Sequence, residues 1–116
     1  MRAQSTLTVT PVDHPLVGRV SPPGSKSITN RALLLAGLAK GTSRLSGALK
    51  SDDTRVMSEA LRLMGVQVDE PDDSTFVVTS SGQWLAPQQA LFLGNAGTAT
   101  RFLTAAACLA TQDVVI

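Results

Sequence analysis

The chain has 116 residues, of which 43% are hydrophobic, and this is enough for one domain with a modest core. Ten Lys and Arg against nine Asp and Glu give a net charge of +1, which argues against a duplex nucleic acid as partner. Only 3% of the residues are aromatic, so few rings are available to stack on single-stranded bases. Composition therefore excludes the common nucleic-acid-binding classes.

The sequence offers no disulfide framework and no metal-binding motif. Cys108 is the single cysteine, and no Cys/His cluster has the spacing of metal ligands. The start of the sequence lacks the apolar segment of a signal peptide, and no uncharged apolar stretch approaches the roughly 20 residues that span a bilayer. We therefore expect no metal, no membrane contact and a cytoplasmic location. Cys108 falls among Ala and Leu on a predicted helix, which indicates a buried, inert thiol.

The first quarter of the chain changes from a strand pattern to a helix pattern. Alternating β-branched and aliphatic residues predict short strands at 6–10 and 16–20. Two prolines and a glycine within residues 21–25 predict a loop. From Ser27 an apolar stripe with helical spacing predicts a helix, and Lys40-Gly41 is its expected stop.

The rest of the chain alternates between strands and helices. Residues 42–49 predict a strand, and Ser51 or Asp52 is the expected cap of a helix that runs to about Met64. We interpret Asp52 and Asp53 as acids that complement the dipole of that helix rather than as catalytic carboxylates. The remaining predicted elements are a hairpin at 66–68 and 76–78, a surface loop at 80–89, a strand at 91–93, a helix at about 98–110 and a strand that begins at 114–116.

An internal repeat relates the two predicted glycine turns. In each copy a glycine turn opens an apolar helix that carries an arginine one to two turns further on, and the order strand, loop, helix, strand is the same. We interpret this as a duplicated supersecondary unit. A shift of about 70 residues superimposes Gly24 on Gly94, Arg31 on Arg101, Leu33 on Leu103 and Ala36 on Ala106.

The first candidate site is Gly24-Ser25-Lys26-Ser27 at a predicted helix start, followed by Arg31. A helix N-terminus presents unpaired N–H groups and about half a positive charge, and Ser, Lys and Arg side chains complete a cradle for a phosphate. The spacing departs from the P-loop because Ser25 stands between Gly24 and Lys26, so a nucleotide kinase is rejected. An ordinary capped surface turn with a solvated lysine remains the alternative.

The second candidate site is Gly94-Asn95-Ala96-Gly97-Thr98, again at a predicted helix start and followed by Arg101. Small residues allow the backbone to approach a ligand closely. A tight turn whose glycines serve only geometry remains the alternative, but two such turns with matching arginines favour a shared anion site. We interpret His14, isolated between Asp13 and Pro15, as a loop histidine.

Taken together, these segments resemble the N-terminal part of the 5-enolpyruvylshikimate-3-phosphate (EPSP) synthase family. The resemblance covers essentially the whole chain in order and spacing. It implies an α/β fold of the α+β type, with repeated βαβαββ units in two domains. The motifs that carry it are Pro23-Gly24-Ser25-Lys26-Ser27 with Asn30-Arg31-Ala32-Leu33-Leu34-Leu35, Ser51-Asp52-Asp53, and Leu93-Gly94-Asn95-Ala96-Gly97-Thr98-Ala99 with Arg101.

The resemblance also implies a domain assignment. Residues 1–20 would supply the first strands, of which the earliest would belong to the other domain of the full enzyme. Residues 21–116 would form an incomplete domain, with one full βαβαββ unit and most of a second. Because the family's enzyme is several times longer and this chain ends on β-branched residues without a turn or cap, we expect a fragment. Alone it would be inactive, and its partner would be the missing remainder or a second copy.

The implied activity is that of an enolpyruvyl transferase of the shikimate pathway. The 5-hydroxyl of shikimate 3-phosphate would attack C2 of phosphoenolpyruvate, and phosphate would leave after a tetrahedral intermediate. No metal or organic cofactor is expected. The resemblance assigns Lys26 to catalysis and to both substrates, Ser27 and Arg31 to shikimate 3-phosphate, Asn95, Gly97 and Thr98 to the phosphoenolpyruvate side, and Arg101 to a supporting role.

One departure from the family's pattern lies in the second turn. The family commonly continues as Ala-Met-Arg-Pro, whereas this chain reads Ala99-Thr100-Arg101-Phe102. We expect Phe102 to shift the loop around Gly97 slightly. The family's inhibitor glyphosate occupies the phosphoenolpyruvate site. Gly97 therefore suggests that the full-length enzyme is sensitive to glyphosate, whereas the loop shift expected from Phe102 argues against it.

Two alternatives remain beside this interpretation. The enolpyruvyl transferase of UDP-N-acetylglucosamine shares the fold but normally shows Ser-Gly-Ala-Lys-Asn where this chain has residues 23–27, which favours shikimate 3-phosphate. The other is a non-catalytic phosphate-binding module that ends at Ile116. A reading frame that continues past Ile116 would argue against such a module.

Overall fold

The computed structural model describes residues 6–116. The first five residues of the predicted segment 1–20 lie outside this range. The described chain mixes helices and strands, which confirms the predicted fold class. Its strands form one antiparallel sheet in the order β1-β3-β2. The elements are α1 (Lys26–Leu38), β1 (Gly41–Leu45), α2 (Asp52–Leu63), β2 (Gln67–Asp72), β3 (Thr75–Ser80) and α3 (Gly97–Ala107).

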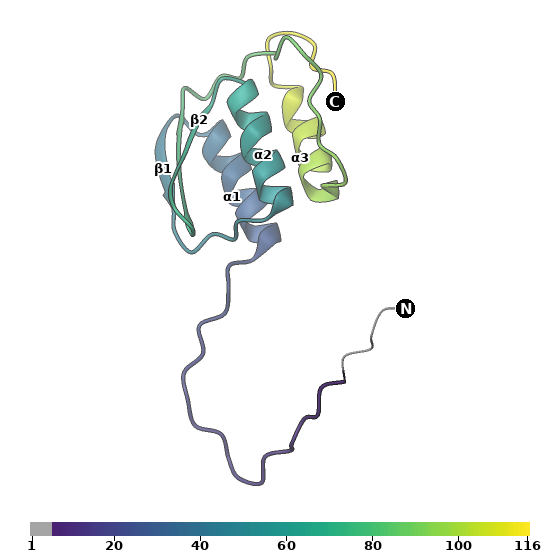
Figure 1. Cartoon of the computed structure of the whole chain (residues 1–116). Helices are drawn as coiled ribbons and strands as arrows, with labels where there is room; N and C mark the ends of the chain where they lie inside the picture. The colour runs from purple at the N-terminus through teal and green to yellow at the C-terminus, as the bar shows by residue number, and fades with distance from the viewer. Residues whose placement is uncertain (1–5) are drawn as a thin grey trace.

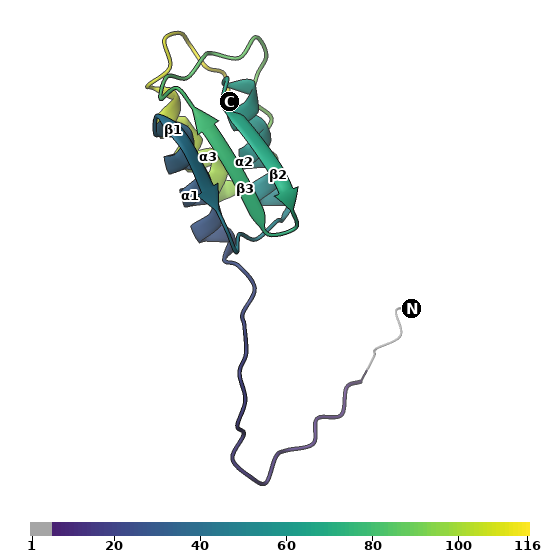
Figure 2. The same cartoon turned by 90° about the vertical axis from the view of Figure 1, so that its left-hand side faces the viewer.

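The sheet is built around β3, as Figure 2 shows with β1 and β2 on its two sides. β1 pairs with β3 from Gly41 opposite Ser80 to Leu45 opposite Phe76. β2 and β3 form the predicted hairpin, which is longer than expected and has a register shift between Asp69 and Asp72. Phe76, Val78 and Ser80 of β3 are buried because alternate residues of the strand face the helices.

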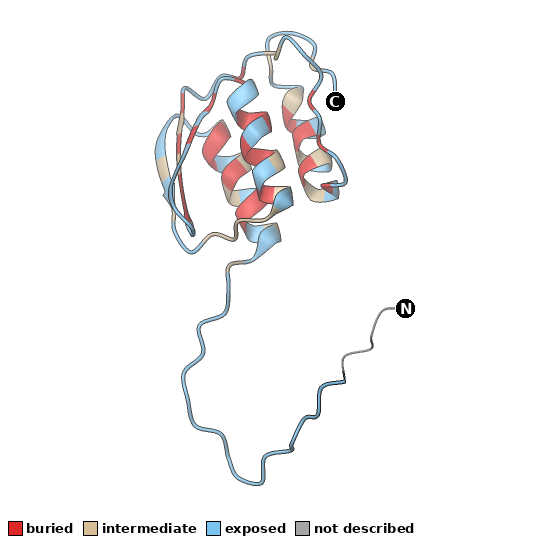
Figure 3. Cartoon of the chain, in the orientation of Figure 1, coloured by how far each residue is buried: buried red, intermediate tan, exposed pale blue. Residues whose placement is uncertain are grey.

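The molecule has three layers, namely the sheet, the pair α1 and α2, and α3 on the far side of that pair (Figure 1). Buried residues lie on the inner faces of these layers (Figure 3). All three helices begin at the same end of the molecule, so the positive ends of their dipoles point the same way (Figure 1). Within residues 6–116 no helix is long and apolar enough to cross a membrane.

The far end of α1 is anchored in the core through Gly37. Its carbonyl oxygen accepts hydrogen bonds from Ser80 Oγ at 2.7 Å and from Trp84 Nε1 at 2.8 Å. A Cβ at this position would lie 2.9 Å from Leu61 Cδ2, so a larger residue at this position would require the Leu61 side chain to move. These contacts fix the helix that carries the first candidate site.

The predicted repeat is supported by burial. Leu33 and Leu103 are both fully buried, and Ala36 and Ala106 are both within the core. The two arginines that the repeat aligns are exposed in both copies. α1 and α3 therefore present the same pattern of inner and outer faces, as expected for two copies of one unit.

Four predicted strands do not form. Residues 6–23, here called the N-terminal arm, are extended but run away from the sheet, so the expected strands at 6–10 and 16–20 have no ladder partner (Figures 1 and 3). Residues 91–93 and 114–116 lie side by side, since Leu91 N donates to Val115 O at 2.9 Å, yet no regular ladder forms. Alternation predicts a strand only where a partner is in place.

Three further expectations need correction. The loop at 80–89 is not wholly a surface loop, because Trp84 is 1% exposed and donates its indole N–H to Gly37. The predicted strand at 42–49 ends at Leu45, since Gly47 adopts a φ of +67° that turns the chain. Cys108 is exposed at the end of α3 rather than buried, because α3 ends earlier than predicted.

Candidate anion-binding site

The start of α2 is closed by its own residues. Ser51 and Thr54 form a reciprocal capping box, in which Thr54 N donates to Ser51 Oγ at 3.4 Å and Ser51 N donates to Thr54 Oγ1 at 2.8 Å. Asp52 and Asp53 add negative charge in the first turn. This confirms the interpretation of both acids as complements of the helix dipole, and it leaves little at this helix start for an external anion.

The start of α1 is more open. Ser25 is the N-cap and its Oγ accepts from Ile28 N at 3.4 Å, while no acid occurs in the first turn. Its first helical residues are Lys26, exposed, and Ser27, half-buried. Gly24 fixes the turn before them, because a Cβ there would lie only 2.4 Å from Gly47 O. The close packing of Gly24 on the chain at 47–49 therefore places the cationic start of α1.

Lys26 is held by an ion pair that sequence spacing did not predict. Its Nζ lies 3.0 Å from Asp53 Oδ2 in the first turn of α2. The Lys26 side chain is 49% exposed, so donors of its ammonium group remain accessible to solvent. Asp53 thus orients Lys26 without covering it.

Arg31 lies between α1 and α3. Its Nη1 donates to Ser27 O at 3.1 Å, and its guanidinium carbon lies 5.3 Å from the centroid of the Phe102 ring on α3. The side chain is exposed, as a ligand for an anion must be. Lys26, Ser27 and Arg31 therefore lie together on the first two turns of α1.

The start of α3 has no side-chain cap. Its N-cap residue is Ala96, with φ −76° and ψ 71°, and Gly97 N bonds to Asn95 O at 2.9 Å. Gly94 has a φ of +52°, which favours glycine. A Cβ on Gly97 would have nothing within 4 Å, so the backbone there is open to a ligand.

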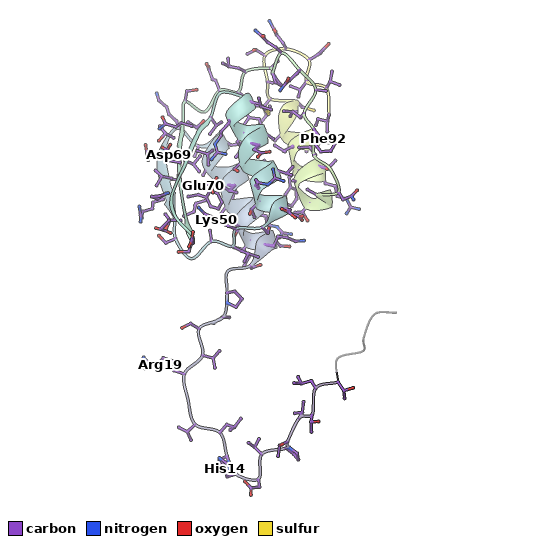
Figure 4. The ribbon with its side chains drawn as sticks, in the orientation of Figure 1. His14, Arg19, Lys50, Asp69, Glu70 and Phe92 are labelled. Atoms are coloured by element: carbon purple, nitrogen blue, oxygen red, sulfur yellow. The ribbon has the colours of Figure 1, made fainter. Side chains whose placement is uncertain are left out.

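The remaining residues of the second turn are also accessible. Asn95 and Arg101 are exposed and Thr98 is half-buried. Phe92, on the segment before the turn, points outward in Figure 4 and is 87% exposed. Among residues 6–116 no hydrogen bond or ion pair joins this turn to the residues at the start of α1, but the helices α1 and α3 that follow the two turns pack together, in part through Arg31 and Phe102.

Asn30 is a buried polar residue that sequence reasoning left without a role. It is fully buried, and neither Nδ2 nor Oδ1 has a hydrogen-bond partner within the described range. Its position four residues after Lys26 places both on one face of α1. The signal in the sequence was an Asn on the apolar stripe of a helix, where an aliphatic residue is the norm.

A second group of charges lies between α2 and the sheet. Glu70 bonds to Arg62 at 2.9 Å and to Lys50 at 2.9 Å, and Figure 4 shows Lys50 and Glu70 on this side of the molecule. The hydrogen bond from Arg62, with a further one from Lys50, lowers the pKa of Glu70 below its ordinary value of 4.5. These cations are therefore already paired within the chain, unlike Arg31.

Comparisons with known proteins identify the family to which this chain is similar. Residues 11–116 match the family of EPSP synthase (3-phosphoshikimate 1-carboxyvinyltransferase). A 3-phosphoshikimate 1-carboxyvinyltransferase of Pseudomonas savastanoi pv. phaseolicola is 86% identical over the whole chain, which spans 28% of that relative. One from Rhizobium etli (strain CIAT 652) is 69% identical, also over the whole chain and 28% of the relative.

The fold is also found among solved structures. An EPSP synthase from Acinetobacter baumannii aligns with a TM-score of 0.72 and 32% sequence identity, covering 78% of this chain and 21% of that one. Because the family match covers nearly all of the described residues, the chain belongs to the EPSP synthase family. It spans just over a quarter of the length of the curated relatives it matches.

Proposed function

We propose that this chain forms the N-terminal part of an EPSP synthase and supplies the first half of its anion site. Such an enzyme transfers the enolpyruvyl group of phosphoenolpyruvate to the 5-hydroxyl of shikimate 3-phosphate and releases phosphate. The observation that carries the proposal is the accessible cluster of Lys26, Ser27 and Arg31 at the open start of α1. Both substrates are phosphorylated carboxylates, which need such donors.

Each residue of the first turn has a proposed task. Lys26 contacts both anionic substrates, and its ammonium group stabilises charge that develops as the tetrahedral intermediate forms. Ser27 and Arg31 hold shikimate 3-phosphate. Arg31 is suited to this because a guanidinium fork binds phosphate through two parallel hydrogen bonds.

The second turn is proposed to border phosphoenolpyruvate. Asn95, Gly97 and Thr98 stand at the uncapped start of α3, where the accessible backbone around Gly97 allows close approach of an anion. Arg101 supports the same side from the next turn. In the reaction the 5-hydroxyl oxygen bonds to C2 of phosphoenolpyruvate and the bond from C2 to the phosphate oxygen breaks.

The remaining parts of the proposal concern the whole enzyme. The reaction needs no metal or organic cofactor, since both substrates already carry the reacting groups. Residues 1–20 would form strands only in the whole enzyme, the earliest of them with partners in the other domain, and the rest belongs to one domain. We place the enzyme in the cytoplasm, with its remaining sequence or a second copy as the partner of this chain.

A hybrid enzyme tests the proposal. This chain replaces the 116 matching residues of the Pseudomonas savastanoi relative, and phosphate release from phosphoenolpyruvate is measured with and without shikimate 3-phosphate. We expect activity that requires both substrates and falls sharply in Arg31→Ala. The matched control is Arg44→Ala, an exposed arginine of the sheet that has no proposed role at the site and should keep full activity.

Binding to the unmodified chain provides a second test. Calorimetric titration with shikimate 3-phosphate should give a signal that Lys26→Ala and Arg31→Ala both abolish. UDP-N-acetylglucosamine as the preferred acceptor of the hybrid would instead support the related transferase. A hybrid that folds and binds shikimate 3-phosphate but never turns over would support the non-catalytic module.

A further inference from the structure

The contact between Arg31 and Phe102 joins the two proposed substrate turns. The guanidinium carbon lies 5.3 Å from the ring centroid, within the distance of about 6 Å at which a cation is attracted by the face of an aromatic ring. Arg31 comes from the second turn of α1, and Phe102 follows Arg101 on α3. The contact therefore spans two helices whose starts bear the two halves of the anion site.

Phe102 is one of few groups that hold the Arg31 side chain. Between residues 6 and 116, Arg31 has no carboxylate within ion-pair distance, and its side chain donates a hydrogen bond to Ser27 O on its own helix. An unrestrained arginine loses considerable side-chain entropy when it binds a ligand. The ring face and the Ser27 carbonyl together restrict the guanidinium group to the start of α1.

An aromatic ring at position 102 differs in kind from the proline that the family commonly has there. A saturated ring has no negative face, so it cannot attract a guanidinium group in this way. Phe102 is also half-buried against the core, so its position relative to α1 is fixed by packing. Phe102, which departs from the family pattern, thus contacts Arg31, the residue proposed to bind shikimate 3-phosphate.

We propose that Phe102 is a positioning residue that orients Arg31 for shikimate 3-phosphate. This inference rests on the function proposed above. The ring itself does not touch the substrate, and it acts by holding the guanidinium group beside Ser27 before the anion arrives. Phe102 therefore affects the affinity for shikimate 3-phosphate through Arg31, although it belongs to the helix of the other turn.

The test compares three variants of Phe102 in the hybrid enzyme. Phe102→Leu keeps an apolar side chain and helix propensity but removes the ring, and Phe102→Met does the same if Leu packs poorly. Phe102→Tyr keeps the ring and is the conservative control. Phe102→Pro is unsuitable, because proline in the interior of α3 also removes a backbone hydrogen bond.

We expect Phe102→Leu to raise the KM for shikimate 3-phosphate about two- to fivefold, the range of an exposed cation–π contact. The KM for phosphoenolpyruvate, kcat and the midpoint of thermal unfolding should stay close to those of the parent. Phe102→Tyr should retain the parent's KM for shikimate 3-phosphate. A general packing defect would instead alter the unfolding midpoint and both KM values.

A double-mutant cycle separates this inference from the proposed function. In the Arg31→Ala background, Phe102→Leu should have no further effect on the KM for shikimate 3-phosphate. Additive effects, or no effect of Phe102→Leu where Arg31→Ala alone raises KM, would overturn the positioning role and leave the proposed function intact. No effect of Arg31→Ala itself would overturn both, since the assignment of Arg31 to shikimate 3-phosphate would then fail.

Discussion

The starts of α1 and α2 lie side by side but use the same physical property in opposite ways. α2 satisfies its own free N–H groups with a capping box and two acids. α1 has one long cap contact, no acid and a lysine at its first position. The difference shows that a helix dipole marks a binding site only where the chain has left it unneutralised.

Removal of Lys26 should have the largest effect, because it takes the cation from the open helix start. In the hybrid enzyme Lys26→Ala should lower kcat/KM by about 100-fold or more, the usual loss when a donor to developing charge is removed. Lys40→Ala, an exposed lysine beyond the other end of α1, is the matched control and should leave kcat/KM unchanged. Equal effects of both variants would remove the distinction between the two ends of α1.

The two glycine turns should respond differently to a methyl group. Gly24→Ala should lower the free energy of unfolding by about 1–3 kcal/mol, because the new Cβ would overlap the backbone at 47–49. Gly97→Ala should leave stability unchanged but raise the KM for phosphoenolpyruvate about tenfold, since its Cβ would stand in open space at the proposed site.

Urea unfolding of the 116-residue chain measures the stability, with Trp84 as the sole tryptophan and a buried fluorescent reporter. Steady-state kinetics of the hybrid measure the KM. If Gly97→Ala unfolds as readily as Gly24→Ala, then the two turns serve the same structural purpose. In that case the second turn would not be distinguished as a site.

Local patterns predicted the elements that are specified by residues close together in the sequence. The helices α1 and α2 and the hairpin were predicted from periodicity and turn residues, and Ser51 caps α2 with both acids in its first turn, as predicted. The face of α1 was not predicted correctly, because Ile28 and Leu35 of its predicted apolar stripe are exposed. The arm was misread because alternation at 6–10 and 16–20 indicates an ability to pair, whereas pairing needs a neighbouring strand. The same limit applies to 91–93.

The candidate site was predictable as a set of residues but not as a set of contacts. Lys26, Ser27 and Arg31 fall on one helix start, so their proximity follows from sequence spacing. The ion pair with Asp53 and the ring contact with Phe102 join separate elements, and nothing in local spacing specifies them. Only the fold brings these partners together.

Loss of the α2 cap should change stability and leave binding intact. Ser51→Ala should lower the free energy of unfolding by about 1 kcal/mol, because it removes the side-chain half of the capping box. The KM for both substrates in the hybrid should not change. Ser25→Ala at the start of α1 is the matched comparison, and we expect a smaller effect on unfolding because Ser25 is exposed and its Oγ contacts Ile28 N alone, whereas the half-buried Ser51 Oγ contacts both Thr54 N and Thr54 Oγ1. A raised KM in Ser51→Ala would show that α2 belongs to the site after all.

The smallest effect on stability should come from a change at Glu70, whose carboxylate forms ion pairs with Lys50 and Arg62. Since Arg62 and Lys50 lower the pKa of Glu70 in the folded chain, the carboxylate stabilises the fold above pH 4.5. That contribution is lost as the pH falls through the lowered pKa. Glu70→Gln should therefore lower the free energy of unfolding at pH 7 by less than about 1 kcal/mol, because the groups are partly exposed.

The pH dependence of that difference separates charge from packing. As the pH falls below 4.5 the parent chain takes up a proton at Glu70, so its stability should converge on that of Glu70→Gln. Added salt should also reduce the difference in the free energy of unfolding between the parent chain and Glu70→Gln at pH 7. The matched control is Glu59→Gln, whose exposed carboxylate pairs only with Arg55 on the same helix and should matter less. If the difference in the free energy of unfolding persists at low pH, then the effect of Glu70 comes from packing. In that case Glu70 would not be the group that neutralises Lys50 and Arg62.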